Sequence, residues 1–152
     1  MFIAINSEDS MKAFGETIGS FLHGGEIIEL IGDVGSGKTT LTKGIAVGLG
    51  IDEYVQSPSF MISRVYKGRN NITLAHYDFY RFDDAGIMAN ELHEAIGEPS
   101  VVTIIEWVGI VQGVLPADRL SIQITSPTEN SREVNCTSSG NVSKKLEEQL
   151  KS

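Results

Sequence analysis

Residues 26–50 read Glu26-Ile27-Ile28-Glu29-Leu30-Ile31, then Gly32-Asp33-Val34-Gly35-Ser36-Gly37-Lys38-Thr39, then an apolar-periodic run that ends at Leu49-Gly50. The first six residues predict a short buried strand, and residues 38–49 predict a helix that stops at the glycine. The loop between them has the spacing Gly-x-x-x-x-Gly-Lys-Thr. A strand, this loop and a helix in that order are the context in which the spacing forms a phosphate-binding loop.

The fixed residues of the loop each have a physical reason. Its glycines allow tight turns that aim backbone N–H groups at an anion, and the start of the helix adds a favourable dipole. Lys38 is expected to reach the β and γ phosphates of a nucleotide, Thr39 to offer its hydroxyl to Mg²⁺, and Thr40 to bind the α phosphate. The alternative is a glycine-rich turn that contains a lysine by chance, which the flanking strand and helix disfavour.

Two carboxylates follow apolar strand-like runs. Asp78 comes after Thr-Leu-Ala-His-Tyr, and Glu106 comes after Val-Val-Thr-Ile-Ile. The second run indicates a central strand covered on both faces, whose carboxyl end should face a ligand site. We predict that Glu106 is the metal-side acid, with Thr39, because a buried unpaired carboxylate would be costly without a cation. Either carboxylate could instead cap a turn.

Three other features lie between and beside these residues. The segment Ser57-Pro58-Ser59-Phe60 lies where hydroxyl groups can sense a γ phosphate, although a turn entering a strand explains it nearly as well. Trp107 either covers the nucleotide, docks a partner or belongs to the core. His76 is expected to be a packed, hydrogen-bonded histidine, and three widely spaced histidines disfavour zinc. The expected nucleotide contacts are Asp33, Val34, Gly35, Ser36, Gly37, Lys38, Thr39, Thr40, Ser59 and Trp107.

The rest of the chain supplies the elements of an α/β fold. The patterns predict strands at residues 2–5, 59–66, 72–80, 101–105, 120–125 and 132–137, and helices at residues 7–22 and 84–96. Residues 67–71 predict a hairpin turn, and residues 140–152 predict a terminal helix or a frayed tail. We therefore predict a single domain over residues 1–152, a three-layer P-loop NTPase-like fold with a central mixed sheet of parallel and antiparallel strands.

Composition limits the functions that are open to this domain. The chain has 152 residues and a formal net charge of −8, which argues against a surface that binds nucleic acid by itself. Cys136 is the single cysteine, so an intramolecular disulfide or a cysteine-rich metal site is excluded and a reduced, cytoplasmic setting is expected. The sequence has neither a secretory pattern nor an apolar run long enough for a membrane span, so we expect no membrane association.

The motifs taken together are more specific than the loop alone. The order is Gly-Asp-x-Gly-x-Gly-Lys-Thr-Thr, then Ser-Pro-Ser-Phe, then His76-Tyr77-Asp78-Phe79-Tyr80-Arg81, then Glu106-Trp107. This combination resembles the bacterial TsaE (YjeE) family over about residues 25–125. The sequence departs from the family's pattern at Ser59, where threonine is usual, at Val108, where proline or a small residue is common, and within residues 87–97.

The resemblance implies an ATPase that supports synthesis of N6-threonylcarbamoyladenosine at position 37 of tRNA. Members work with the TsaB and TsaD proteins, and TsaD carries the transfer chemistry, so tRNA is reached only through the complex. The resemblance also implies ATP and Mg²⁺ as cofactors and Lys38, Asp78 and Glu106 as catalytic residues. Thr39 and Glu106 would manage Mg²⁺, Asp78 would organise hydrolysis, and Trp107 with residues 57–60 would form a mobile wall.

Two other functions share the phosphate-binding loop. A small-molecule kinase needs an acceptor pocket and usually an arginine-rich lid, whereas Arg64, Arg69 and Arg81 are scattered around the predicted hairpin. A nucleotide sensor that binds ATP and a partner without hydrolysis is also compatible with the sequence. Turnover measured with and without TsaB and TsaD separates the three.

Overall fold

A mixed seven-stranded sheet forms the centre of the protein, and the computed structural model describes residues 1–56, 63–80 and 86–152. The strand order is β1-β7-β6-β2-β5-β4-β3. Strands β4, β5, β2 and β6 run parallel, whereas β3, β7 and β1 join through antiparallel pairs. The strands are β1 (Phe2–Ile5), β2 (Ile27–Ile31), β3 (Ser63–Lys67), β4 (Thr73–Asp78), β5 (Val101–Glu106), β6 (Leu120–Thr128) and β7 (Ser131–Ser138).

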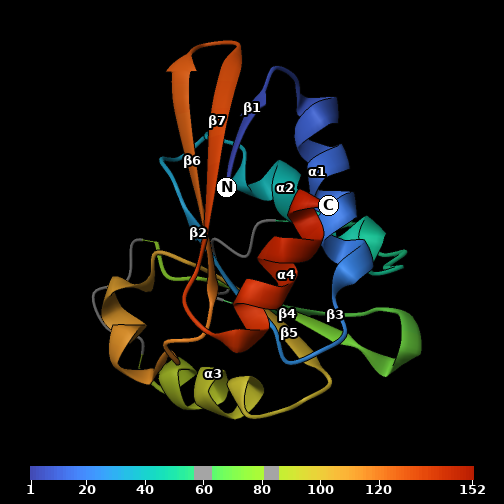
Figure 1. The fold of residues 1–152 in the computed structure, drawn as a ribbon. Helices are drawn as coiled ribbons and strands as arrows, with labels where there is room; N and C mark the ends of the chain where they lie inside the picture. Colours follow the sequence, from blue (N-terminus) through green and yellow to red (C-terminus); the bar gives the residue numbers. More distant parts are fainter. Residues whose placement is uncertain (57–62, 81–85) are drawn as a thin grey trace.

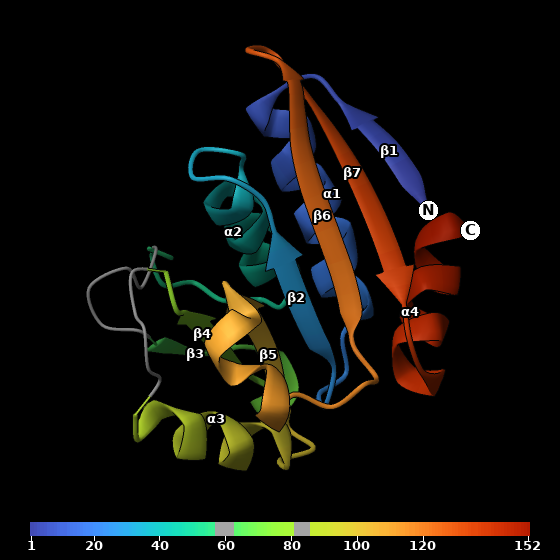
Figure 2. The same cartoon turned by 90° about the vertical axis from the view of Figure 1, so that its left-hand side faces the viewer.

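Helices cover both faces of this sheet, which confirms the predicted three-layer α/β architecture (Figures 1 and 2). On one face, α1 (Glu8–Phe21), α2 (Lys38–Gly48) and α4 (Asn141–Lys151) enclose the larger core with Ile28, Leu74 and Ile104. On the other, α3 (Met88–Ile96) and the 3-10 helix η2 (Val108–Val114) pack on Ile27, Tyr77 and Ile105. Alternate residues of β2 and β5 enter different cores because successive strand side chains point to opposite faces.

Helices α1 and α2 pack unusually closely, through a seam of four glycines. Gly15 and Gly19 of α1 face Gly44 and Gly48 of α2. A Cβ atom on Gly19 would lie 2.9 Å from the Gly48 Cα atom and closer still to the Ile45 carbonyl oxygen. The two backbones therefore touch directly, and α1 fixes the position of the helix that follows the phosphate-binding loop.

Most predicted elements are present, with shifted ends. Strands β3 and β4 form the predicted antiparallel hairpin, closed by a short 3-10 helix η1 (Arg69–Asn71). Strand β5 lies between β2 and β4 in the sheet, as predicted from its apolar run. Residues 141–151 form α4, whose Leu146 is buried in the larger core, so this segment is a docked helix rather than a frayed tail.

Two segments differ from expectation. Residues 84–96 were expected to be one helix; in the described part α3 begins at Met88, and residues 84 and 85 lie outside the described residues. The 3-10 helix η2 was not predicted. Within residues 1–56, 63–80 and 86–152, no helix is long and apolar enough to cross a membrane.

Candidate functional site

The loop between β2 and α2 has the conformation that its glycines require. Gly35 and Gly37 adopt φ angles of 82° and 114°, in the left-handed region that disfavours other residues. Gly37 is also the N-cap of α2, so no side chain caps the first helical turn. The N–H groups at a helix start have no partner within the helix, and together with the helix dipole they suit an anion.

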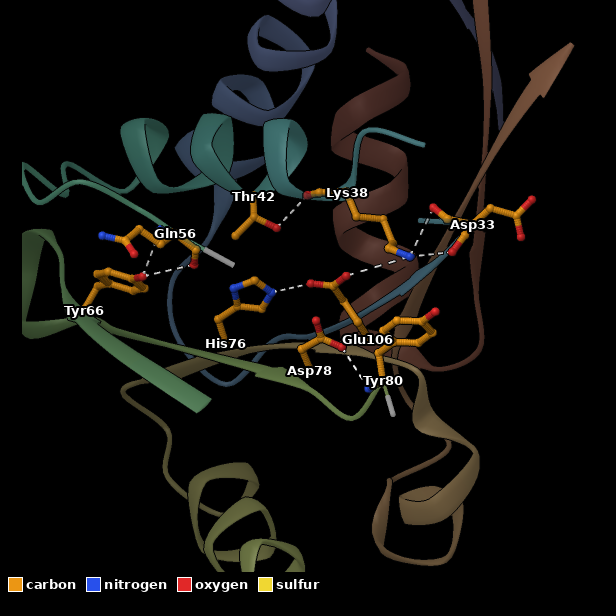
Figure 3. Close-up of polar contacts among 10 residues, drawn as sticks. Asp33, Lys38, Thr42, Gln56, Tyr66, His76, Asp78, Tyr80 and Glu106 are labelled. Atoms are coloured by element: carbon orange, nitrogen blue, oxygen red, sulfur yellow. Dashed lines mark hydrogen bonds and ion pairs between the residues drawn. The ribbon is translucent and has the colours of Figure 1, made fainter. Parts of the chain in front are cut away.

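Lys38 lies folded over this loop and is only 7% exposed. Its Nζ atom donates hydrogen bonds to the carbonyl oxygens of Gly32 and Asp33, the second at 3.4 Å. The same atom lies 3.9 Å from Glu106 Oε1 (Figure 3). It also lies 4.5 Å from the centre of the Trp107 ring. A buried ammonium group is therefore held between backbone carbonyls, one carboxylate and one aromatic face.

Asp78 and Glu106 are the last residues of β4 and β5 and lie directly opposite each other in the parallel ladder. Both are buried, at 5% and 3% exposure. Asp78 Oδ1 accepts a hydrogen bond from the Tyr80 amide at 3.0 Å, and Glu106 Oε2 lies 2.6 Å from His76 Nε2 (Figure 3). Burial raises the pKa of the Asp78 carboxyl, and the nearby Glu106 charge adds to that rise against the opposing bond from Tyr80.

Trp107 forms a wall beside these charged groups. Its backbone φ of 58° is left-handed, which is an outlier for a bulky residue and turns the chain from β5 into η2. The ring centre lies 4.8 Å from that of Tyr80, at an interplanar angle of 34°, while its face covers Lys38. Trp107 is 37% exposed, so the core interpretation is wrong and the side chain stands at the edge of the site.

These groups line a cavity of about 890 Å³. The same cavity is lined by Asn6 and Ser7, just before α1, and by Asn130 and Arg132 of the β6–β7 hairpin. Ligand pockets typically measure about 300–1,000 Å³. The cavity therefore has the volume of a typical ligand pocket.

The contribution of the β6–β7 hairpin to this cavity was not predicted from the sequence. Arg132 Nε donates to the Ser36 carbonyl oxygen at 3.0 Å, and its guanidinium also donates to the carbonyl oxygens of Thr128 and Glu129. The residue therefore ties the hairpin to the phosphate loop, 96 positions earlier in the chain. No local motif marks such a contact, because Arg132 approaches the loop only through the order of strands in the sheet.

The oxygen donors at the loop end are suited to Mg²⁺. Thr39, Asp78 and Glu106 all line the cavity and present a hydroxyl and two carboxylates. Magnesium prefers oxygen ligands, and beside nucleotide phosphates it takes only one or two from protein carboxylates.

The structure brings together nearly all the residues predicted for the site. Val34 to Thr40, Asp78, Glu106 and Trp107 line one cavity, and Asp33 contacts the Lys38 ammonium through its carbonyl oxygen. Ser59 and the rest of residues 57–60 lie outside the described residues. The predicted buried, hydrogen-bonded state of His76 is confirmed, since the side chain is fully buried against Glu106.

Comparison with known proteins agrees with this geometry. A sequence model of the family described as threonylcarbamoyl adenosine biosynthesis protein TsaE matches residues 5–134. The TsaE protein of Bacillus subtilis is 36% identical over 148 residues, covering 96% of this chain and 90% of that protein. The TsaE protein of Treponema pallidum is 34% identical over 136 residues, covering 87% and 96%.

A solved structure shows the same fold. The crystal structure of Bacillus subtilis YdiB superposes with a TM-score of 0.82 and 32% sequence identity, covering 99% of this chain and 93% of that chain. The shared architecture extends from β1 to α4, well beyond the phosphate loop. The chain therefore belongs to the TsaE family of threonylcarbamoyl adenosine biosynthesis proteins.

Proposed function

We propose that this protein is a cytoplasmic ATPase that binds ATP with Mg²⁺ and supports formation of N6-threonylcarbamoyladenosine at position 37 of tRNA, together with TsaB and TsaD. The observation that carries the proposal is the convergence of Lys38, Asp78 and Glu106 in the cavity. Phosphate transfer to water depends mainly on positioning and on charge stabilisation. This convergence of one ammonium group and two carboxylates supports both.

Each group has a task in this proposal. Lys38 would leave its carbonyl partners and bind the β and γ phosphates, while the loop N–H groups hold the same anions. Thr39 and Glu106 would bind Mg²⁺, which neutralises charge on the phosphates when present. Asp78, whose pKa is raised, would orient the attacking water from beside Glu106. Trp107 would shield the site from bulk water.

The acidity of the chain supports indirect contact with tRNA. With a net charge of −8, the protein lacks the excess of Lys and Arg that drives binding to phosphate backbones. We therefore assign tRNA binding and the transfer chemistry to the partners. In this scheme ATP hydrolysis resets the complex between turnovers.

A radiolabelled turnover assay tests the proposal against the sensor and the kinase. ATP labelled at the γ phosphate is incubated with the protein, with and without TsaB, TsaD, substrate tRNA and an activated threonylcarbamoyl donor, while free phosphate and modified tRNA are counted. We expect free phosphate and more than one modified tRNA per TsaB and TsaD pair. ATP binding without phosphate release supports a sensor, and label transferred to an acceptor supports a kinase; either result contradicts the proposal.

A further inference from the structure

His76 is a fully buried polar side chain in β4, two residues before Asp78. Its Nε2 atom lies 2.6 Å from Glu106 Oε2, a short hydrogen bond between neighbouring strands (Figure 3). The other ring nitrogen, Nδ1, is buried and has no hydrogen-bond partner among residues 1–56, 63–80 and 86–152. Within that described part of the chain, the single polar contact of this ring is with Glu106.

A buried histidine with an unpaired ring nitrogen lowers the stability of the folded state, so its contact with Glu106 is expected to have a function. A polar group that is buried without a partner loses its hydrogen bonds to water and destabilises the folded state, and Nδ1 is such a group among the described residues. An apolar side chain at position 76 would avoid this destabilisation, since the residue opposite in β5 is Ile104 and the residue two places earlier is Leu74. Core packing therefore gives no reason for a histidine at this position.

Because of this contact, the two oxygen atoms of the Glu106 carboxylate face different groups. Oε2 is held inward by His76, and Oε1 lies 3.9 Å from the Lys38 ammonium, toward the phosphate loop. A distance of 3.9 Å is too long for a hydrogen bond, so Lys38 alone does not fix the rotation of the carboxylate. His76 does, because a bond at 2.6 Å to a buried ring leaves little freedom about the last torsion.

We propose that His76 is a positioning residue that holds the Glu106 carboxylate so that Oε1 faces the metal and phosphate end of the cavity. The inference rests on the proposed function, in which Glu106 binds Mg²⁺ beside the nucleotide. Hydrogen-bond partners behind metal ligands orient those ligands, and their loss typically costs about 10–100-fold in metal affinity or activity. The effect of His76 should therefore fall on the metal and much less on the nucleotide.

Three substitutions and a matched control separate positioning from general stability. His76→Leu removes the bond, His76→Asn keeps a polar side chain that is too short to reach Oε2, and His76→Gln extends an amide N–H about as far as Nε2. Thr103→Val is the control: Thr103 is fully buried in β5 on the opposite face from Glu106, and its hydroxyl has no partner among the described residues. Melting temperatures of all four variants report any general loss of stability.

The readout is the affinity for Mn²⁺, followed by electron paramagnetic resonance with the protein saturated by ADP, beside ADP affinity measured in EDTA. We expect His76→Leu and His76→Asn to bind Mn²⁺ about 10–100-fold more weakly, with metal-free ADP affinity within about twofold of the original protein. His76→Gln should recover most of the loss, and Thr103→Val should match the original protein. If His76→Leu does not fold, the contrast between Asn and Gln carries the test.

Unchanged Mn²⁺ affinity in the folded Leu or Asn variants, or equal losses in Asn and Gln, would overturn the positioning role. A parallel loss of metal-free ADP affinity would overturn it too, because that pattern reports a deformed cavity. Failure of the unsubstituted protein to bind ADP is a different result, since it refutes the proposed function and removes the basis of the inference with it.

Discussion

Replacing Gly19 by alanine tests whether the α1–α2 seam is as rigid as its geometry indicates. The added Cβ atom would lie 2.9 Å from the Gly48 Cα atom, whereas ordinary contacts begin at 3.4 Å, so the helices must separate by at least 0.5 Å (3.4 minus 2.9). The closer obstacle, the Ile45 carbonyl oxygen, belongs to the backbone and cannot rotate away as a side chain would.

Two effects of opposite sign compete in this variant. Alanine is a better helix former than glycine by about 1 kcal/mol, and overpacking a core costs about 1–3 kcal/mol. Because the obstacle is backbone, we take the upper end of the cost, which leaves a net loss of about 2 kcal/mol. For a chain of this size that loss lowers Tm by about 4–8 °C.

Thermal unfolding followed by circular dichroism measures this loss. Gly113→Ala is the matched control, because a Cβ atom there meets no atom of the described residues within 4 Å. The control should change Tm by less than about 2 °C. If Gly19→Ala raises Tm, helix propensity outweighs the clash and the reasoning about a rigid seam is refuted.

Three further outcomes follow from the site and from the charge of the chain. Lys38→Met should weaken ATP binding about 10–100-fold, since hydrogen bonds to charged groups contribute about 1.5–3 kcal/mol. Lys43→Met in the same helix should leave ATP affinity unchanged, because the Lys43 ammonium lies over the Tyr54 ring. Equal ATP affinities of the two variants in calorimetry would contradict this prediction. Asp78→Asn should raise the free energy of unfolding at pH 7. A carboxyl whose pKa is raised in the folded state destabilises it above that pKa, and the Asn oxygen still accepts the Tyr80 amide bond. In urea titrations, the gain in the free energy of unfolding should shrink as the pH falls through the raised folded pKa toward 3.8. An Asn variant that is less stable at pH 7 would show that the Asp78 carboxylate stabilises the folded state and would contradict this prediction. The protein without partners should bind tRNA negligibly in filter binding at physiological salt, and tight binding there would contradict the indirect role.

The sequence predicted the features of this fold that depend on local pattern. The run before Glu106 indicated a central strand, and β5 is indeed paired on both sides. The glycines of the loop predicted its tight turns, and Gly35 and Gly37 have positive φ angles. Asp78 and Glu106 were each predicted at the end of an apolar strand, and they are the last residues of β4 and β5.

Features that depend on strand order and register could not be predicted in this way. The contact of His76 with Glu106 requires both the parallel pairing of β4 with β5 and the orientation of two side chains. Arg132 reaches the loop only because β6 lies next to β2. Trp107 could be core or surface, and its left-handed backbone, which turns it to the cavity edge, is a tertiary effect.

The glycine seam shows a similar limit. Gly15 and Gly19 in α1, and Gly44 and Gly48 in α2, share a four-residue spacing that is visible in the sequence. Helix propensity alone predicts that each glycine destabilises its helix, because glycine is unfavourable in helix interiors. Only the close approach of two backbones explains why these positions lack side chains.

The most direct test of the account compares phosphate release from ATP by the original protein and by Glu106→Gln. Both proteins are saturated with ATP in the presence of Mg²⁺, TsaB and TsaD. Glutamine keeps the size of the side chain and an oxygen for His76 to contact, but removes the charge beside Lys38. We predict ATP affinity within about threefold and phosphate release reduced by about a hundredfold or more. Phosphate release by Glu106→Gln at the original rate would contradict the assignment of Glu106 and with it the proposed ATPase site.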